Sequence, residues 1–123
     1  MENKTRNYRD PLVWQKGIRL AEVIYVLTAG FPAEEKFGLI AQLRRASVSI
    51  PSNIAEGQAR RTTGEFVQFI SNAEGSVAEV ETQPILSIEL NICRGTEAGF
   101  AFDLIAELQK MLNGLRRKLL VRD

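Results

Sequence analysis

The sequence predicts an all-α fold, an up-down four-helix bundle, from three observations. Apolar residues recur three and four positions apart in four successive stretches, which is the period of a helix buried along one face. No stretch combines two-residue alternation with the turn residues of a β-hairpin. Short turn-forming segments separate the four stretches, and short connections favour antiparallel neighbours. We expect one domain over 1–123, long enough to bury a core without disulfides or metal.

The first helix is expected at 11–29. Asp10 suits its N-cap, and Pro11 suits its first helical position, where a missing N–H costs nothing. Apolar residues three and four positions apart form a stripe along one face of this helix. Four further residues widen this stripe, namely Trp14, Ile18, Ala21 and Tyr25. A Gly-Phe-Pro segment at 30–32 ends the helix.

The second helix is expected at 33–57, with two glutamates near its start that suit the N-terminal dipole. Pro51 lies in its middle and removes the hydrogen bond to the carbonyl of Ser47. Because the apolar stripe keeps its phase through Pro51, we predict one kinked helix instead of two helices. The hydroxyls of Ser47 and Ser49 are expected to help satisfy the freed backbone groups.

The third helix is expected at 63–91. Thr62 and Glu65 match a capping box, in which the hydroxyl accepts the N3 amide and the carboxylate reaches back. Pro84 predicts either a kink in this helix or a break within it. A Gly-Ser pair at 75–76 predicts that another helix approaches closely.

The fourth helix is expected at 97–120, with Thr96 as its cap. It carries an uninterrupted heptad seam of the kind found in coiled coils and bundles. The seam consists of Ala101, Ile105, Leu108, Leu112, Leu115 and Leu119.

The net charge of +1 conceals a segregated pattern. Residues 1–61 carry ten Lys and Arg against six Asp and Glu, which gives +4. Residues 62–109 carry one Arg against eight acidic residues, which gives −7, and residues 110–123 carry five basic residues against one Asp, which gives +4. Separate basic and acidic surfaces suit either an anionic partner or self-association.

The residue types needed for most catalytic and metal sites are missing. The chain has no histidine and a single cysteine, Cys93, which excludes Ser-His-Asp and Cys-His catalysis and the usual zinc sites. Glu74, Glu79 and Glu81 form the one close group of carboxylates, and a solvated acidic helix face explains them. We therefore predict a protein that is not an enzyme and that uses no cofactor and no metal. The single cysteine and the lack of a long apolar run predict a cytoplasmic location.

Several motifs resemble those of one known family. The central one is the run Ser-Ile-Pro-Ser-Asn-Ile-Ala-Glu-Gly at 49–57, preceded by Gln-Leu-Arg-Arg-Ala at 42–46. Further family-like segments lie at 12–16, 60–66, 74–83 and 110–115. Together they resemble the four-helix-bundle family named after proteins encoded in intervening sequences of bacterial 23S rRNA genes. Pro84 departs from the family pattern, which tends to a leucine at that point.

The resemblance implies a four-helix protomer and ring-like homopentamers. It also implies a relationship to the accessory proteins of diversity-generating retroelements, whose basic pentameric barrels engage nucleic acid and a reverse transcriptase. A homopentamer, RNA or DNA, and a protein partner such as a reverse transcriptase are therefore the expected partners.

Basic side chains are the candidate binding residues, because the planar arginine fork donates two parallel hydrogen bonds to a phosphate. The candidates are Arg44, Arg45, Arg60, Arg61, Arg116, Arg117 and Lys118. Arg44 and Arg60 lie about 160° apart around a straight helix, so the sequence does not guarantee one flat stripe. Aromatic residues that could stack on bases are few near these cations, with Tyr8 and Trp14 the candidates, so contacts to backbone phosphate are expected.

Polar residues of the second helix also share one face. Arg45, Ser49, Ser52 and Glu56 fall within about 60° of one another on an ideal helix, which predicts an internal polar strip. In one interpretation Arg45 and Glu56 pair with other helices or subunits and fix their packing. Asn53, beside the apolar stripe, is expected to be largely buried and hydrogen-bonded across helices.

Two functions follow from these residues. The first is a non-enzymatic oligomeric module that binds the backbone of RNA or DNA. The alternative is a protein–protein interaction scaffold whose arginines serve subunit contacts and which has no nucleic-acid role. Exposure of Arg44, Arg45, Arg60 and Arg61 on one continuous face would favour the first, and engagement of these side chains in protein contacts would favour the second.

Overall fold

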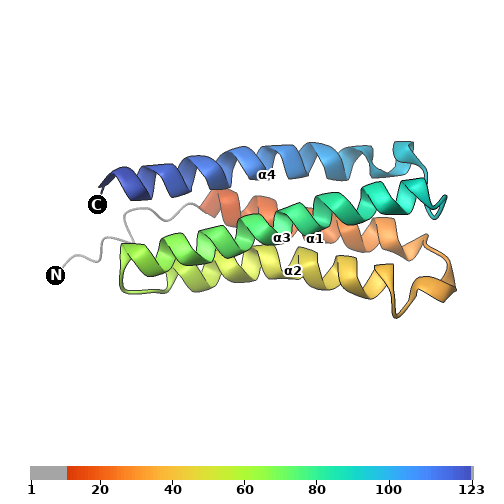
Figure 1. The fold of residues 1–123 in the computed structure, drawn as a ribbon, viewed down its shortest axis with the longest axis horizontal. Coiled ribbons are helices and arrows are strands. Elements are labelled where there is room, and N and C mark those ends of the chain that lie inside the picture. The colour runs from red at the N-terminus through yellow and green to blue at the C-terminus, as the bar shows by residue number, and fades with distance from the viewer. Residues whose placement is uncertain (1–10, 123) are drawn as a thin grey trace.

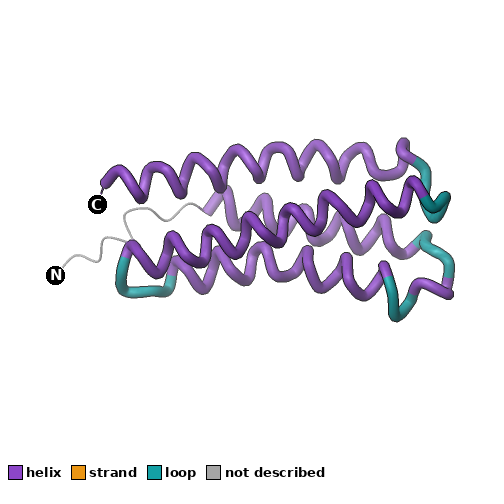
Figure 2. Tube along the Cα trace, in the orientation of Figure 1, coloured by secondary structure: helices purple, strands orange, loops and turns teal. Residues whose placement is uncertain are grey.

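Four helices form the described part of the chain, residues 11–122, in the computed structural model (Figure 1). They are α1 (Pro11–Ala29), α2 (Leu39–Gln58), α3 (Thr63–Glu89) and α4 (Gly95–Arg122), with a short 3-10 helix, η2 (Ala33–Glu35), between α1 and α2. This part of the chain contains no strand, and its loops are short and lie at the two ends of the bundle (Figure 2). The all-α, four-helix prediction is confirmed. The predictions for Tyr8 and Asp10 lie outside the described residues.

Each helix packs against its neighbours in the chain, and α1 also packs against α4, so the four helices surround one core. Successive helices are joined at alternate ends of the bundle (Figure 1). The start of α1, the α2–α3 loop and the end of α4 therefore lie at one end, and the two remaining connections lie at the other.

The core is apolar and receives side chains from all four helices. All six residues of the predicted α4 seam are buried, from Ala101 to Leu119. They meet fully buried side chains of the other helices, among them Leu20, Ile50 and Phe66. Burial of one large apolar side chain stabilises the fold by about 1.5–3 kcal/mol, so this core carries most of the stability.

The start of α2 differs from the prediction. The sequence placed it near Ala33, but the structure has η2 there and begins α2 at Leu39. A carboxylate oxygen of Glu35 accepts a hydrogen bond from the Leu39 amide at 3.2 Å, and Gly38 has non-helical backbone angles (φ −106°, ψ −112°). Glu35 lies before α2 and caps the start of this helix with its side chain. The sequence predicted Glu35 inside the first turn of the helix and did not indicate this capping role.

Both internal prolines lie within continuous helices, Pro51 in α2 and Pro84 in α3. The predicted continuity through Pro51 is therefore correct, while the kinks remain predictions. Pro51 is buried against α1, where a Cβ added to Gly17 would lie 3.4 Å from the proline ring. The hydroxyls of Ser47 and Ser49 donate to carbonyls three residues earlier, Arg44 and Ala46, and not to the carbonyl that Pro51 frees.

The ends of α3 and the start of α4 show how backbone groups are satisfied. Thr62 Oγ1 accepts the Glu65 amide at 3.1 Å, as the capping box predicts. At the other end Asn91 has a left-handed conformation (φ 60°), and the Ile92 amide donates back to the Ser87 carbonyl at 2.8 Å. This is the pattern of a Schellman motif, and it ends α3 two residues earlier than predicted.

The predicted cap of α4 is wrong. The helix begins at Gly95, so Thr96 lies inside it. The carboxylate of Glu97 instead accepts the Arg94 amide at 2.7 Å. A glutamate in the first turn thus performs the capping, which also suits the helix dipole.

In the Gly-Ser pair at 75–76, the glycine is exposed to solvent and the serine is buried in the core. Ser76 is buried and lies 2.6 Å from the Ser49 hydroxyl of α2. Gly75 is exposed, and an added Cβ would meet nothing within 4 Å. The predicted close approach of a helix therefore holds at Ser76 and is wrong, within this chain, at Gly75.

We predict opposite effects of the same substitution at two helical glycines. In Gly57→Ala the new methyl would lie 2.8 Å from a ring carbon of Phe66, so α2 and α3 must shift and the free energy of unfolding should fall by about 1–3 kcal/mol. In the control, Gly75→Ala, the methyl has free space and helix propensity should raise stability by about 0.5–1 kcal/mol. Urea unfolding measures both, and equal effects would contradict the packing at Gly57.

Candidate interaction surfaces

Arg44 is occupied at the end of α1. Its Nε donates to the hydroxyl of Thr28 at 2.8 Å and its Nη2 to the carbonyl of Tyr25 at 3.3 Å. Its guanidinium also stacks on the Tyr25 ring, 4.5 Å from the centroid. The last turn of α1 has no basic residue of its own, so Arg44 supplies the positive charge that a helix C-terminus favours. Arg44 therefore joins α2 to α1 and is not a free binding group.

The predicted polar strip of α2 lies at the surface. Arg45, Ser52 and Glu56 are exposed, and Ser49 is half-buried in a shallow polar groove between α2 and α3. Arg45 lines this groove without an ion-pair partner in residues 11–122. The strip is therefore not internal to the single chain, and its contact with other subunits stays a prediction.

Arg60 is held by residues near it in the chain, whereas Arg61 is not. One Arg60 nitrogen lies 3.7 Å from a Glu56 carboxylate oxygen, one helical turn earlier. The Arg60 guanidinium also stacks on the Phe69 ring of α3, 4.6 Å from its centroid. Glu56 thus pairs with a residue just beyond the end of its own helix and not across helices. Arg61 is exposed and makes no ion pair with any described residue.

Arg116 joins α4 to α3. Its Nε donates to the Glu74 carboxylate at 2.8 Å and its Nη2 to the side-chain oxygen of Asn113 at 3.0 Å. Glu81 accepts a further cross-helix hydrogen bond from Gln109 at 3.0 Å. Arg117 and Lys118 are exposed, and neither is ion-paired within the described part of the chain.

The structure therefore does not bring the seven candidate cations onto one face. Arg44, Arg60 and Arg116 are engaged within the protomer. Arg45 lies about 20 Å along the α2 axis from Gln58, the last residue of the helix, and Arg61 follows three residues after Gln58. Arg61 follows the end of α2, and the pair 117–118 lies near the end of α4, both towards the same end of the bundle (Figure 1).

Asn53 does not bond across helices. It is half-buried, and its Nδ2 donates to the Ser49 carbonyl of its own helix at 2.8 Å. The prediction of a largely buried, cross-helix asparagine is wrong. A polar side chain at the edge of an apolar stripe can reach the carbonyl four residues earlier, and here it does.

Apolar side chains of α1 are exposed on the flank nearest α2. Trp14 is 39% exposed, Ile18 36% and Tyr25 44%. Val48 of α2 is 44% exposed and follows Arg44, which stacks on Tyr25, by one helical turn, so both lie on the same side of α2. The surface formed by Trp14, Ile18, Tyr25 and Val48 is called the Trp14 face. The sequence assigned its α1 members to a widened buried stripe, but the bundle buries only the inner part of that stripe. The resulting surface combines aromatic and aliphatic side chains with the stacked guanidinium of Arg44.

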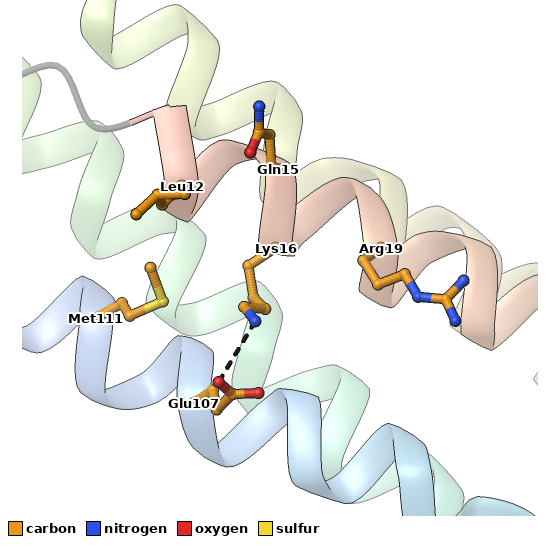
Figure 3. A pocket seen from close by; sticks show the side chains of 6 residues that line it. All are labelled: Leu12, Gln15, Lys16, Arg19, Glu107 and Met111. Atoms are coloured by element: carbon orange, nitrogen blue, oxygen red, sulfur yellow. Dashed lines mark ion pairs between the residues drawn. The ribbon is translucent and has the colours of Figure 1, made fainter.

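A groove on the other flank separates α1 from α4. In its first part Leu12 lies above Met111, and the ammonium of Lys16 pairs with the Glu107 carboxylate at 3.3 Å (Figure 3). A second part continues beyond Arg19, which lines both. The second part is lined by Arg19, Glu22, Val23, Val26, Leu27, Glu97 and Phe100. Both parts together are called the Met111 groove. No motif in the sequence pointed to it, because it arises where two helices that are distant in the chain meet loosely.

One known protein family matches this chain. A family model described as 23S rRNA-intervening sequence protein matches residues 9–114, most of the chain. The chain belongs to this family. A search of the curated proteins found no match. In this member of the 23S rRNA-intervening sequence protein family, no helix among residues 11–122 is long and apolar enough to cross a bilayer. The same residues contain no cluster of potential metal ligands.

We predict that adjacent arginines of α2 respond differently to the same replacement. Arg44→Lys should lower the free energy of unfolding by about 1–2 kcal/mol, because an ammonium group cannot stack on Tyr25 and also replace both hydrogen bonds. Arg45→Lys, the matched control, should change stability by less than about 0.5 kcal/mol, since Arg45 is exposed and unpaired in the described chain. Thermal or urea unfolding distinguishes them. If Arg44→Lys left the free energy of unfolding unchanged, the contacts of Arg44 at the end of α1 would not be needed for stability.

Proposed function

We propose that the protein is a non-enzymatic helical-bundle module that works by associating with further copies of itself. The observation that carries this proposal is the pair of partly exposed apolar surfaces on the two flanks of α1, the Trp14 face and the Met111 groove. Burial of the apolar area that remains exposed there, at about 25 cal/mol per Å², would drive association.

The kind of side chain supports this proposal. Tryptophan, tyrosine and arginine are the residues that most often dominate the binding energy of protein interfaces. Here Trp14, Tyr25 and the stacked guanidinium of Arg44 occur together on one exposed flank. The segregation of charge along the chain can then select the orientation of the copies. Five is the copy number that the family resemblance implies.

We predict that the wild-type protein is larger than its 13.8 kDa chain mass in light scattering at micromolar concentration. Ile18→Asp, on the Trp14 face, should shift the mass towards that of the monomer while the helical circular dichroism spectrum is kept, because a carboxylate at this contact would be desolvated.

The matched control is Ser71→Asp, which places the same charge at an exposed position of α3 and should leave the mass unchanged. A monomeric wild-type protein would refute the proposed function. Dissociation by both variants would show that added negative charge, and not the Trp14 face, is responsible.

Binding of nucleic-acid phosphates is the second candidate function. It is favoured by three exposed cations, Arg61, Arg117 and Lys118, which make no ion pair with the described residues and lie towards one end of the bundle. Several copies of such an end, held in one assembly, would add avidity to weak contacts. Contacts to phosphate alone would vary little with base sequence.

We predict for this second function that binding to unrelated RNA and DNA is detectable by filter retention at about 50 mM salt and falls steeply by about 200 mM, because counterions are released. Arg61→Glu combined with Arg117→Glu should abolish it. Arg45→Glu, at an equally exposed arginine distant from Arg61, should weaken binding much less. Absence of binding at low salt, or equal losses in both variants, would contradict a phosphate site at this end.

A further inference from the structure

The two apolar surfaces lie on nearly opposite flanks of α1. On a helix that advances 100° per residue, Trp14 and Tyr25 differ by about 20°, as do Leu12 and Val23 of the groove. The two pairs are separated by about 160° around the helix axis. The inner side of α1, with Leu20 and the other core residues, occupies the wider arc of about 200° between them. Association through one surface alone would therefore leave the other exposed.

The two surfaces also differ in shape. The Trp14 face consists of bulky side chains that are 36–44% exposed. The Met111 groove is a hollow between α1 and α4, with Leu12 and Met111 at one end and Val26 and Phe100 at the other. Bulky, partly exposed side chains can fill a hollow better than they can interdigitate with a second copy of themselves. This favours contact between unlike surfaces.

We infer that the Trp14 face of one copy docks in the Met111 groove of the next copy, with the bundles side by side. This inference rests on the proposed self-association and identifies the surfaces that carry it. Contacts between unlike surfaces are heterologous, and they build a ring when the rotation from copy to copy closes. Both surfaces are then buried in every copy, which contact between two like faces cannot achieve.

Length and register agree with such a contact. The Trp14 face extends along α1 for about 16 Å, from Trp14 to Tyr25, and the groove extends for about 21 Å, from Leu12 to Val26. Both surfaces run along the same helix, α1, so they occupy the same range along the bundle axis in every copy. Copies related by rotation about an axis parallel to the bundle would therefore place the two surfaces side by side along their whole length.

Charge supports the same register. At the Tyr25 end of the Trp14 face, the Arg44 guanidinium has hydrogen bonds but no carboxylate partner among the described residues. At the corresponding end of the groove lie Glu22 and Glu97, whose ion pairs within the chain, at 3.5 and 3.7 Å, are solvent-exposed. Opposite charges thus lie at matching heights, which favours this orientation over the reversed one.

Cross-linking between two variants, each with one introduced cysteine, tests the inference. Val48→Cys marks the Trp14 face and Val26→Cys marks the rim of the groove, and both positions are exposed. The native Cys93 should stay silent, because burial, aided by the Glu97 carboxylate, raises the pKa of its thiol and keeps it protonated. The two variants are unfolded together in urea, refolded as an equal mixture, and treated with a short bis-maleimide.

The expected result is a cross-linked dimer in the mixture and none in either variant alone. The double variant should give a ladder of larger products. A dimer from Val48→Cys alone would show like-to-like contact and overturn the inference. An oligomer that gives no product in the mixture would also overturn it, while leaving the proposed self-association intact. A monomer in light scattering would instead refute self-association itself.

Discussion

Four helices around one core can cover only the inner side of each helix, and this constraint governs the whole molecule. In α4 the six residues of the heptad seam are buried, while Phe100, Leu120 and Val121 lie outside the seam and stay exposed. In α1 apolar residues occupy more of the circumference than the neighbouring helices can reach. Trp14, Ile18 and Tyr25 remain outside on one flank, and Leu12 and Val26 remain outside on the other. The excess on α1 is the physical basis for treating this helix as the centre of association.

The arginines show how a bundle uses cations for its own construction. Arg44 binds the end of α1, Arg60 combines an aromatic ring with a carboxylate, and Arg116 joins α4 to α3. Each is anchored by a planar guanidinium that stacks or bonds in a fixed direction, which a lysine would not reproduce. A cluster of arginines in the sequence of a helical protein is therefore weak support for a phosphate site until their partners are known.

The sequence predicted what depends on local periodicity and failed where distant partners decide. The α4 seam, the Thr62 cap and the continuity of α2 through Pro51 follow from spacing within one segment, and the structure confirms them. The roles of Arg44 and Asn53 depend on which groups lie within reach of a long or short side chain, and spacing does not contain that information. The exposed flank of α1 was missed for a related reason. The width of an apolar stripe can be read from the sequence, but how much of it the neighbours cover cannot.

The seam between α1 and α4 differs from the other three because it joins the two helices that are farthest apart in the chain. The α1–α2, α2–α3 and α3–α4 contacts form between consecutive helices, and each closes only a short loop. The α1–α4 seam is also hollowed along the Met111 groove, where about half of the lining side chains are charged or polar. Local opening concentrates where buried contacts are sparse. Amide hydrogens of α1 and α4 should therefore exchange with solvent sooner than those of α2 and α3, and a neighbouring copy seated in the groove would slow this exchange by closing the weakest side of the bundle.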